Sequence, residues 1–211
     1  MVLMMKNINE KNYPNISEAV AFRITFDHFV YTYDSDAMEL YFPTKCSCCG
    51  YSPQVMDLRV PKSNCKKDYG ILDTYEYGVS PSLKNKLIEL FDITEKDFRP
   101  IVNKAGEIVY YQIAPQHVML PLIGVNRWRA LKPCRKCGRI EYREKEYRNE
   151  NDEQYRFITP DALQDLKDIN VSYERFNMDM PLFVVSRRVY DYLTAIYPKM
   201  RFEPFFLKNN I

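Results

Sequence analysis

The sequence predicts an α+β fold with mixed or antiparallel sheets and a few helices. Several short segments alternate apolar and polar residues, as half-buried strands do, and others place apolar residues at helical spacing behind a Ser or Thr cap. The chain has 211 residues, of which 46% are hydrophobic and 27% charged, which is ordinary for a globular protein. We expect one α+β domain over residues 16–211, preceded by a flexible polar segment over residues 1–15.

Strands are predicted in the N-terminal part of the chain. Apolar and polar residues alternate from Ala21 to Phe26, and aromatic residues continue the pattern to Tyr33. A second alternation over residues 38–42 runs into a cysteine-rich segment, so we expect a hairpin that ends there. Residues 51–79 contain two prolines and two glycines and are predicted to be irregular.

The middle of the chain contains two helix starts and a hairpin. Ser80 precedes Pro81 at a predicted helix start, and Thr94 is a predicted cap of a second, short helix with Asp97 three residues later. Residues 102–113 are predicted to form a hairpin that turns near Gly106. The apolar face of the first helix would comprise Leu83, Leu87, Ile88 and Phe91.

The C-terminal part predicts a βαβ-like ending. Thr159 and Pro160 open a short helix, and residues 182–185 form an apolar strand. Ser186 then caps a helix that continues to Tyr197 and stops at Pro198, and residues 202–207 return as a strand. The buried face of this helix would comprise Val189, Leu193, Ile196 and Tyr197.

Two Cys-x-x-Cys-Gly motifs, at Cys46–Gly50 and Cys134–Gly138, are the most specific signal in the chain. The sequence has only six glycines, and two of them directly follow these motifs, which makes coincidence a poor explanation. In each motif a tight turn can direct two thiolates to one point. Four thiolates form the closed tetrahedron of a structural Zn²⁺ site. The predicted ligands are Cys46, Cys49, Cys134 and Cys137.

Such a site would join residues 46–49 to residues 134–137, across the long intervening segment. Metal binding would then act as a staple between remote segments and contribute to folding. Either of the two other cysteines, Cys48 and Cys65, could be an ordinary thiol. Cys48 could replace Cys46 as a ligand, but Cys48 and Cys49 are adjacent and cannot easily both point inward, so the regular spacing is favoured.

Enzymatic zinc chemistry is not expected. Catalytic zinc sites keep an open position and usually recruit His or carboxylate ligands. The only histidines, His28 and His117, lie in no His-x-Glu or His-Glu-x-x-His pattern. For His28, which follows Asp27, a local hydrogen bond is a better explanation than acid–base chemistry. Two cysteine pairs, each followed by glycine, also differ from the single pair of a redox site.

A nucleic-acid-binding module stabilised by zinc is the alternative function. The net charge is only +2, so a chain-wide basic surface is absent. Basic residues that surround the second motif could instead contact phosphate, or offset the charge of a zinc–tetrathiolate centre. The local cluster comprises Arg127, Trp128, Arg129, Lys132, Arg135, Lys136 and Arg139.

The sequence has no secretory signal pattern and no stretch long enough to span a bilayer, so we expect a cytoplasmic protein.

The order of the motifs resembles the bacterial double-CXXCG-motif family, known from a paralogous set in myxobacteria. The resemblance rests on the first motif, on Leu131–Arg139 around the second, and on the ending Asp179–Ser186 with the helix and the Phe202-Glu203-Pro204 strand after it. It covers residues 40–50 and 130–207. The Lys-, Asn- and Ile-rich composition departs from the usual members of the family.

The resemblance implies a non-enzymatic immunity protein of a polymorphic toxin system, which binds a cognate bacterial toxin and blocks it. Inhibition of that kind needs an interface of standard size with aromatic and charged anchors. An acidic and aromatic run is the candidate toxin-binding surface, since a basic toxin would meet it with favourable charge. A solvated strand or loop is the other explanation of this run. The candidate residues are Glu141, Tyr142, Glu144, Glu146, Tyr147, Glu150, Asp152, Glu153 and Tyr155.

Overall fold

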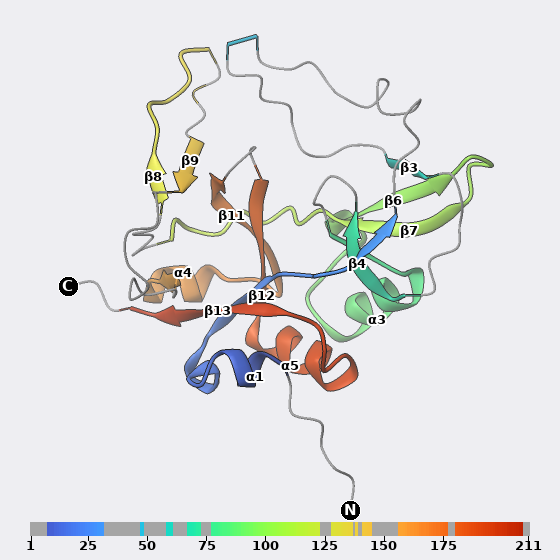
Figure 1. The fold of residues 1–211 in the computed structure, drawn as a ribbon, viewed down its shortest axis with the longest axis horizontal. Helices are drawn as coiled ribbons and strands as arrows, with labels where there is room; N and C mark the ends of the chain where they lie inside the picture. Colours follow the sequence, from blue (N-terminus) through green and yellow to red (C-terminus); the bar gives the residue numbers. More distant parts are fainter. Residues whose placement is uncertain are drawn as a thin grey trace, which may run out of the picture. The chain divides into compact units, whose positions relative to one another are not determined.

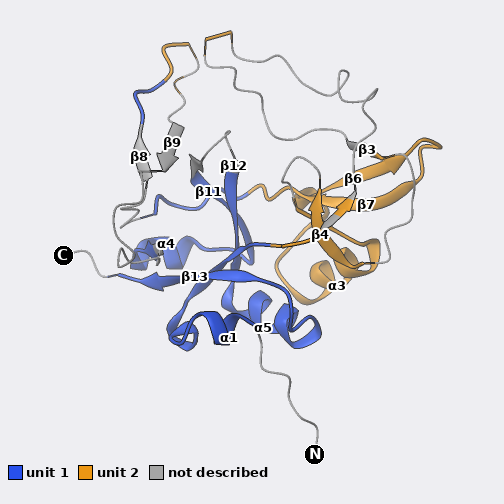
Figure 2. Ribbon diagram, in the orientation of Figure 1, with its two compact units in different colours: residues 1–25, 117–133, 139–211 blue, residues 26–116, 134–138 orange. Residues whose placement is uncertain are grey.

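The structure, a computed structural model, describes the residues 8–31, 47–48, 58–60, 67–72, 77–122, 128–136, 138, 141–144, 156–176 and 180–208. The chain divides into two compact units (Figure 2). Each unit contains one β-sheet with a few helices, which confirms the mixed α+β class. The predicted single domain stays a prediction. Unit 1 comprises Met1–Thr25, His117–Pro133 and Arg139–Ile211, and unit 2 comprises Phe26–Gln116 and Cys134–Gly138.

Unit 1 is built on a seven-stranded sheet with the strand order β10-β13-β1-β12-β11-β9-β8 (Figure 1). Neighbouring strands are antiparallel except for the pairs β10–β13 and β11–β9, which are parallel. The strands are β1 (Ala21–Ile24), β8 (Trp128–Ala130), β9 (Glu141–Glu144), β10 (Arg156–Ile158), β11 (Ile169–Phe176), β12 (Met180–Ser186) and β13 (Phe202–Leu207).

The C-terminal part of unit 1 is a split βαβ unit. β12 leads into α5 (Arg187–Ile196) and then into β13, while β1 lies between the two strands and is antiparallel to both. The βαβ-like ending is therefore confirmed, with an N-terminal strand inserted into it. Ser186 caps α5 as predicted, because its hydroxyl accepts a hydrogen bond from the backbone N–H of Val189.

The buried face of α5 differs in part from the prediction. Val189 and Leu193 are buried as expected, but Ile196 is 41% exposed. Tyr190 and Thr194 are buried instead, and at 100° per residue Ile196 lies about a quarter of a turn from the centre of the buried face. The prediction for Ile196 is wrong because the large ring of Tyr190 packs against Phe22 of the sheet. The buried face of the helix therefore includes Tyr190 and Thr194 and leaves Ile196 at its edge.

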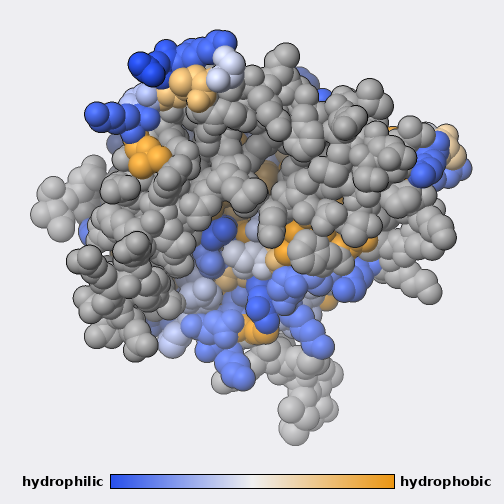
Figure 3. All heavy atoms as spheres, turned by 45° about the horizontal axis from the view of Figure 1, so that its top comes forward, coloured by the Kyte–Doolittle hydropathy of each residue, from blue (hydrophilic) through white to orange (hydrophobic). Residues whose placement is uncertain are grey.

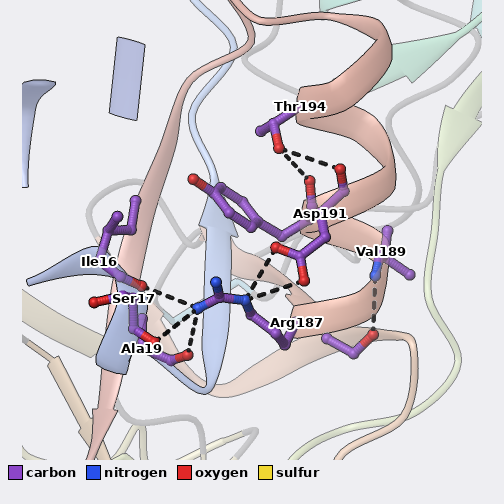
Figure 4. A network of polar contacts seen from close by, with 9 residues as sticks. Ile16, Ser17, Ala19, Arg187, Val189, Asp191 and Thr194 are labelled. Carbon is purple, nitrogen blue, oxygen red and sulfur yellow. Dashed lines mark hydrogen bonds and ion pairs between the residues drawn. The ribbon is translucent and has the colours of Figure 1, made fainter. Parts of the chain in front are cut away.

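Arg187, the first residue of α5, holds the N-terminal turn η1 (Ile16–Glu18) against this helix (Figure 4). Its Nε donates to both carboxylate oxygens of Asp191, at 3.0 and 3.2 Å, which fixes the guanidinium in place. The fork geometry of arginine allows the other side of the group to serve several acceptors at once. Its Nη1 donates to three backbone carbonyls, those of Ile16 (3.0 Å), Ser17 (3.2 Å) and Ala19 (3.2 Å).

The core of unit 1 lies on both faces of its sheet. On one face Phe22 of β1 stacks on Tyr190 of α5, with ring centroids 3.7 Å apart, and Tyr190 meets Phe202 edge-on. Helix α4 (Pro160–Asp165) covers the other face and is capped by Thr159, as predicted. Since successive strand residues point to opposite faces, the adjacent Ala21 and Phe22 belong to different cores. The second core comprises Ala21, Met119, Leu122, Ile158, Ala162, Leu182, Val184 and Phe205.

Part of the predicted flexible N-terminus has a defined structure. Helix α1 (Ile8–Asn12) places Asn9, which is 1% exposed, against the chain that leads into β13. Its Nδ2 donates to the carbonyl of Met200 and its Oδ1 accepts from the N–H of Phe202, both at 2.8 Å. Residues 8–12 thus form a helix whose polar side chain satisfies buried backbone groups, and the flexibility of residues 1–15 stays a prediction. Residues 1–7 lie outside the described residues.

Unit 2 is built on a six-stranded sheet with the order β2-β4-β5-β7-β6-β3. The inner pairs β4–β5, β5–β7 and β6–β7 are antiparallel, and the outer pairs β2–β4 and β3–β6 are parallel. The predicted strand pattern at residues 21–33 is thus shared between β1 of one sheet and β2 of the other. The strands are β2 (Phe29–Tyr31), β3 (Leu58–Val60), β4 (Tyr69–Leu72), β5 (Tyr77–Val79), β6 (Phe98–Asn103) and β7 (Ile108–Ile113).

The helix starts predicted for unit 2 are confirmed. Ser80 caps α3 (Pro81–Leu90) by accepting from the N–H of Leu83 at 3.1 Å. Thr94 begins the single turn η2 (Glu95–Asp97), and its N–H donates to the carboxylate of Asp97 at 2.9 Å, as in a capping box. The β6–β7 hairpin turns at Gly106, whose φ is +83°. Lys84 of α3 is buried, and its ammonium group pairs with the carboxylate of Glu95 at 2.7 Å.

Residues 51–79 were predicted to be irregular, and this prediction is wrong where the structure describes them. Gly70 and Gly78 lie opposite each other in the β4–β5 pair instead of ending strands. A Cβ on Gly70 would lie 2.2 Å from Cγ1 of Val30, and one on Gly78 would lie 2.7 Å from Cε1 of Tyr110. Glycine is used here because neighbouring side chains occupy the space over the strands. The alternation predicted over residues 38–42 lies outside the described residues.

Candidate metal centre

The second cysteine motif, Cys134–Gly138, has the backbone conformation of a knuckle. Arg135 and Lys136 form a turn, and the N–H of Gly138 donates to the carbonyl of Cys134 at 2.8 Å. Gly138 has a φ of +72°, in the left-handed region that favours glycine. A Cβ at this position would meet nothing within 4 Å, so the backbone dihedral, and not lack of space, is what suits glycine here. Cys134 is half-buried, and Cys137 lies outside the described residues.

The first motif is described only at its centre. Ser47 and Cys48 form a turn, and both residues are exposed. Cys46, Cys49 and Gly50 lie outside the described residues, as does Cys65. The turn is nevertheless informative, because Ser47 and Cys48 occupy the same positions in their motif as the turn residues Arg135 and Lys136 do in theirs.

The structure brings the centres of the two motifs together. The Nζ of Lys136 donates a hydrogen bond of 2.7 Å to the Oγ of Ser47, between residues 89 positions apart in the sequence. Both residues belong to unit 2, although the chain on either side of the second motif belongs to unit 1. Figures 1 and 2 show the two short segments side by side at the top of the view. Ser47 and Lys136 each lie inside a motif, so this contact places the two turns next to each other.

The described residues contain no other candidate for a metal site. No group of three or more His, Cys, Asp or Glu side chains among them is arranged to hold a metal ion. Of the four predicted ligands, only Cys134 is described, so this finding concerns the other possible donors. The set Cys46, Cys49, Cys134 and Cys137 stays a prediction.

Each of the two histidines lies next to a carboxylate, which is a sequence neighbour only for His28. The Nδ1 of His28 lies 3.4 Å from the carboxylate of Asp27, and its Nε2 lies 2.7 Å from the carbonyl oxygen of Tyr69. The Nε2 of His117 lies 3.1 Å from the carboxylate of Asp165. The local hydrogen bond predicted for His28 is therefore confirmed. Burial, and secondarily the charge of Asp27, raise the pKa of the Tyr69 hydroxyl above its ordinary value.

The basic cluster around the second motif is described in part. Lys132, Arg135 and Lys136 are exposed, and Lys136 is bonded to Ser47. In the space-filling view, which turns the top of Figure 1 forward, the coloured residues at the upper left include both hydrophilic and hydrophobic ones (Figure 3). Trp128 and Arg129 belong to β8, and nothing is described of their side chains. Arg127 and Arg139 lie outside the described residues.

The predicted toxin-binding surface begins on a strand. Glu141, Tyr142 and Glu144 belong to β9, which pairs with β8 on one side and β11 on the other. This part of the acidic run is therefore a strand, one of the two states predicted for it, although its side chains are not described. Outside the described residues are Glu146, Tyr147, Glu150, Asp152, Glu153 and Tyr155.

Sequence reasoning missed the pairing of Ser47 with Lys136. Lys136 was considered only as one cation of a basic cluster, and Ser47 was not considered at all. The available signal was a hydroxyl in the middle of one motif and an ammonium group in the middle of the other. Such a pair indicates a contact only if the two motifs are already assumed to converge.

Comparison with protein-family models, with curated proteins and with solved structures gave no match. The resemblance to the double-CXXCG-motif family therefore stays a prediction from the motifs. In the described part of the chain, none of the helices combines the length and the apolar character needed to cross a bilayer.

Proposed function

We propose that the two cysteine motifs form one structural Zn²⁺ site with Cys46, Cys49, Cys134 and Cys137 as ligands. The observation that carries this proposal is the hydrogen bond between Lys136 and Ser47, since it joins the centres of both motifs. Two knuckles that face each other supply four soft sulfur donors, the set that structural zinc prefers. When bound, the ion would cross-link remote parts of the chain and would not take part in chemistry.

The local geometry supports this ligand set in two ways. The left-handed Gly138 and its hydrogen bond to Cys134 close the second motif into a compact turn, the conformation in which its two thiolates can converge. In the first motif Cys48 is exposed at the tip of the turn. An exposed thiol suits a residue that is not a ligand of a closed site, which favours Cys46 over Cys48 as a ligand.

We also propose that the protein, with this zinc site as a structural element, is a cytoplasmic immunity protein that neutralises a cognate bacterial toxin by direct binding. The support is the order of the two motifs and of the C-terminal segment, whose βαβ-like ending is present in unit 1. A zinc ion with four thiolate ligands has no open position for a substrate, which suits a binding protein. The acidic and aromatic run 141–155 is the proposed contact surface.

The test is protection of cells that express the toxin domain encoded next to this chain, together with co-purification of the two proteins. The proposal predicts protection and a stable complex. Replacement of Glu146, Glu150 and Glu153 by Lys should abolish both, because a basic toxin would then meet a basic surface. Replacement by Lys of Glu89 in α3 and of Asp92 just after it, which are both exposed, is the control for a charge reversal elsewhere and should leave protection intact. Absence of protection by the unmodified chain would remove this proposal.

A nucleic-acid-binding module remains the second candidate, favoured by the exposure of Lys132 and Arg135 beside the second motif. Phosphate contacts by these side chains would make the affinity fall steeply with salt concentration. Binding of labelled RNA or DNA by the purified protein should then weaken further in the Lys132→Ala/Arg135→Ala variant. A protein that retains no labelled nucleic acid at low salt would exclude this function.

A further inference from the structure

We infer that the Lys136–Ser47 contact is a strap that holds the two cysteine motifs in register and thereby sets their affinity for the metal ion. The inference rests on the zinc site proposed above and adds to it a positioning role for two residues that are not ligands. Its basis is the 2.7 Å hydrogen bond between the side chains of Lys136 and Ser47.

The position of the strap suits this role. Ser47 directly follows the predicted ligand Cys46, and Lys136 directly precedes the predicted ligand Cys137. A contact between them therefore acts on one ligand from each motif. The motifs lie 89 positions apart at this contact, so the chain must lose much conformational freedom when they meet. The hydrogen bond between Lys136 and Ser47 forms without the metal, so it holds the two motifs together in part before the ion binds.

The charge of Lys136 adds to the effect of its geometry. A Zn²⁺ ion with four thiolate ligands carries a net charge of −2, and a cation held beside it offsets part of that charge. Lys132 and Arg135 are also exposed cations near the second motif, but the bond to Ser47 holds the ammonium group of Lys136 between the two motifs. Removal of Lys136 should therefore weaken metal binding more than removal of Lys132.

The experiment measures Zn²⁺ affinity of the full-length protein by competition with a chromophoric chelator, and the absorption spectrum of the Co²⁺-substituted form. Lys136→Met and Ser47→Ala should each lower the Zn²⁺ affinity about two- to fivefold, because a charged contact between exposed side chains contributes less than a buried one. The double variant should bind the ion about as weakly as Lys136→Met alone, because Ser47→Ala removes only a contact that Lys136→Met has already removed. The Co²⁺ spectrum should stay that of four thiolate ligands in all three.

Two control variants separate the strap from general effects. Lys132→Met removes a nearby cation without touching Ser47 and should retain the affinity of the unmodified protein. Ser47→Thr keeps the hydroxyl acceptor and should do the same. Affinities of Lys136→Met and Ser47→Ala equal to that of the unmodified protein, or effects that simply add, would overturn the strap while leaving the zinc site intact. Failure of the unmodified protein to bind either metal would instead overturn both.

Discussion

Gly78 lies directly against the ring of Tyr110, and this contact leaves no room for a side chain. A Cβ would lie 2.7 Å from Cε1 and 2.8 Å from Cδ1 of a ring that is almost fully buried. Gly78→Ala should lower the free energy of unfolding by about 1–3 kcal/mol, the usual cost of overpacking a core. Urea unfolding followed by circular dichroism measures the change.

Gly106→Ala is the control for this substitution. An added methyl group there meets nothing within 4 Å, so the variant carries only the cost of a positive φ, about 1 kcal/mol. An unfolding free energy for Gly78→Ala equal to that of the unmodified protein would show that Tyr110 does not pack as described.

Tyr69 gives unit 2 a defined response to alkaline pH. Burial and, to a smaller extent, Asp27 raise the pKa of its hydroxyl above the ordinary 10.0. The folded state therefore holds this proton more tightly than the unfolded state. The resulting stability is complete below pH 10.0 and is lost as the pH rises through the raised pKa.

Tyr69→Phe removes this titration and keeps most of the packing against Phe26, whose ring lies 4.9 Å away. The free energy of unfolding of the unmodified protein should fall more steeply above pH 10.0 than that of the variant. Equal slopes for the two proteins in that range would contradict the assignment to Tyr69.

At the scale of elements, α1 shows how a short polar helix is fixed to a sheet. Asn9 is its buried residue and serves one backbone acceptor and one backbone donor, at Met200 and Phe202. Asn9→Ala would leave both groups without a partner. We expect a loss of about 2–4 kcal/mol in unfolding free energy and faster hydrogen exchange of the Phe202 amide.

Asn12→Ala is the matched control for Asn9→Ala, since Asn12 is exposed on the same helix. Its effect should stay within about 0.5 kcal/mol, as for other surface substitutions. An Asn9→Ala variant as stable as the control would mean that α1 contributes little to the fold.

The elements that could be predicted from the sequence are those specified by local chemistry. Ser80, Thr159 and Ser186 each bond the backbone three residues later, and a cap of this kind is visible in a few letters of sequence. Gly70 and Gly78 were misread because their role depends on side chains from other strands. The role of Asn9 could not be predicted for the same reason, as its partners lie 191 and 193 positions away.

At the scale of the whole molecule, the same limit applies to the candidate site. The motif spacing predicts that four cysteines converge, but no local pattern indicates which other residues meet there. The Lys136–Ser47 contact, across 89 positions, required the structure. From the sequence, residues 21–33 show one continuous strand-like pattern. In the structure β1 and β2, which both lie within this pattern, belong to different sheets. Strands that are neighbours in the sequence can join different sheets, and the alternation of apolar and polar residues does not indicate which sheet a strand joins.

The central claim is that one zinc ion joins the two motifs, and metal analysis of two cysteine variants tests it most directly. The unmodified protein should contain about one Zn²⁺ per chain, the stoichiometry of a single four-thiolate site. Cys134→Ser should lose the metal and unfold at a lower temperature, because zinc binding contributes to folding. Cys48→Ser, which alters an exposed cysteine of the first motif, should keep both metal and stability. Purified protein without metal, or a Cys134→Ser variant with undiminished zinc content, would contradict the account.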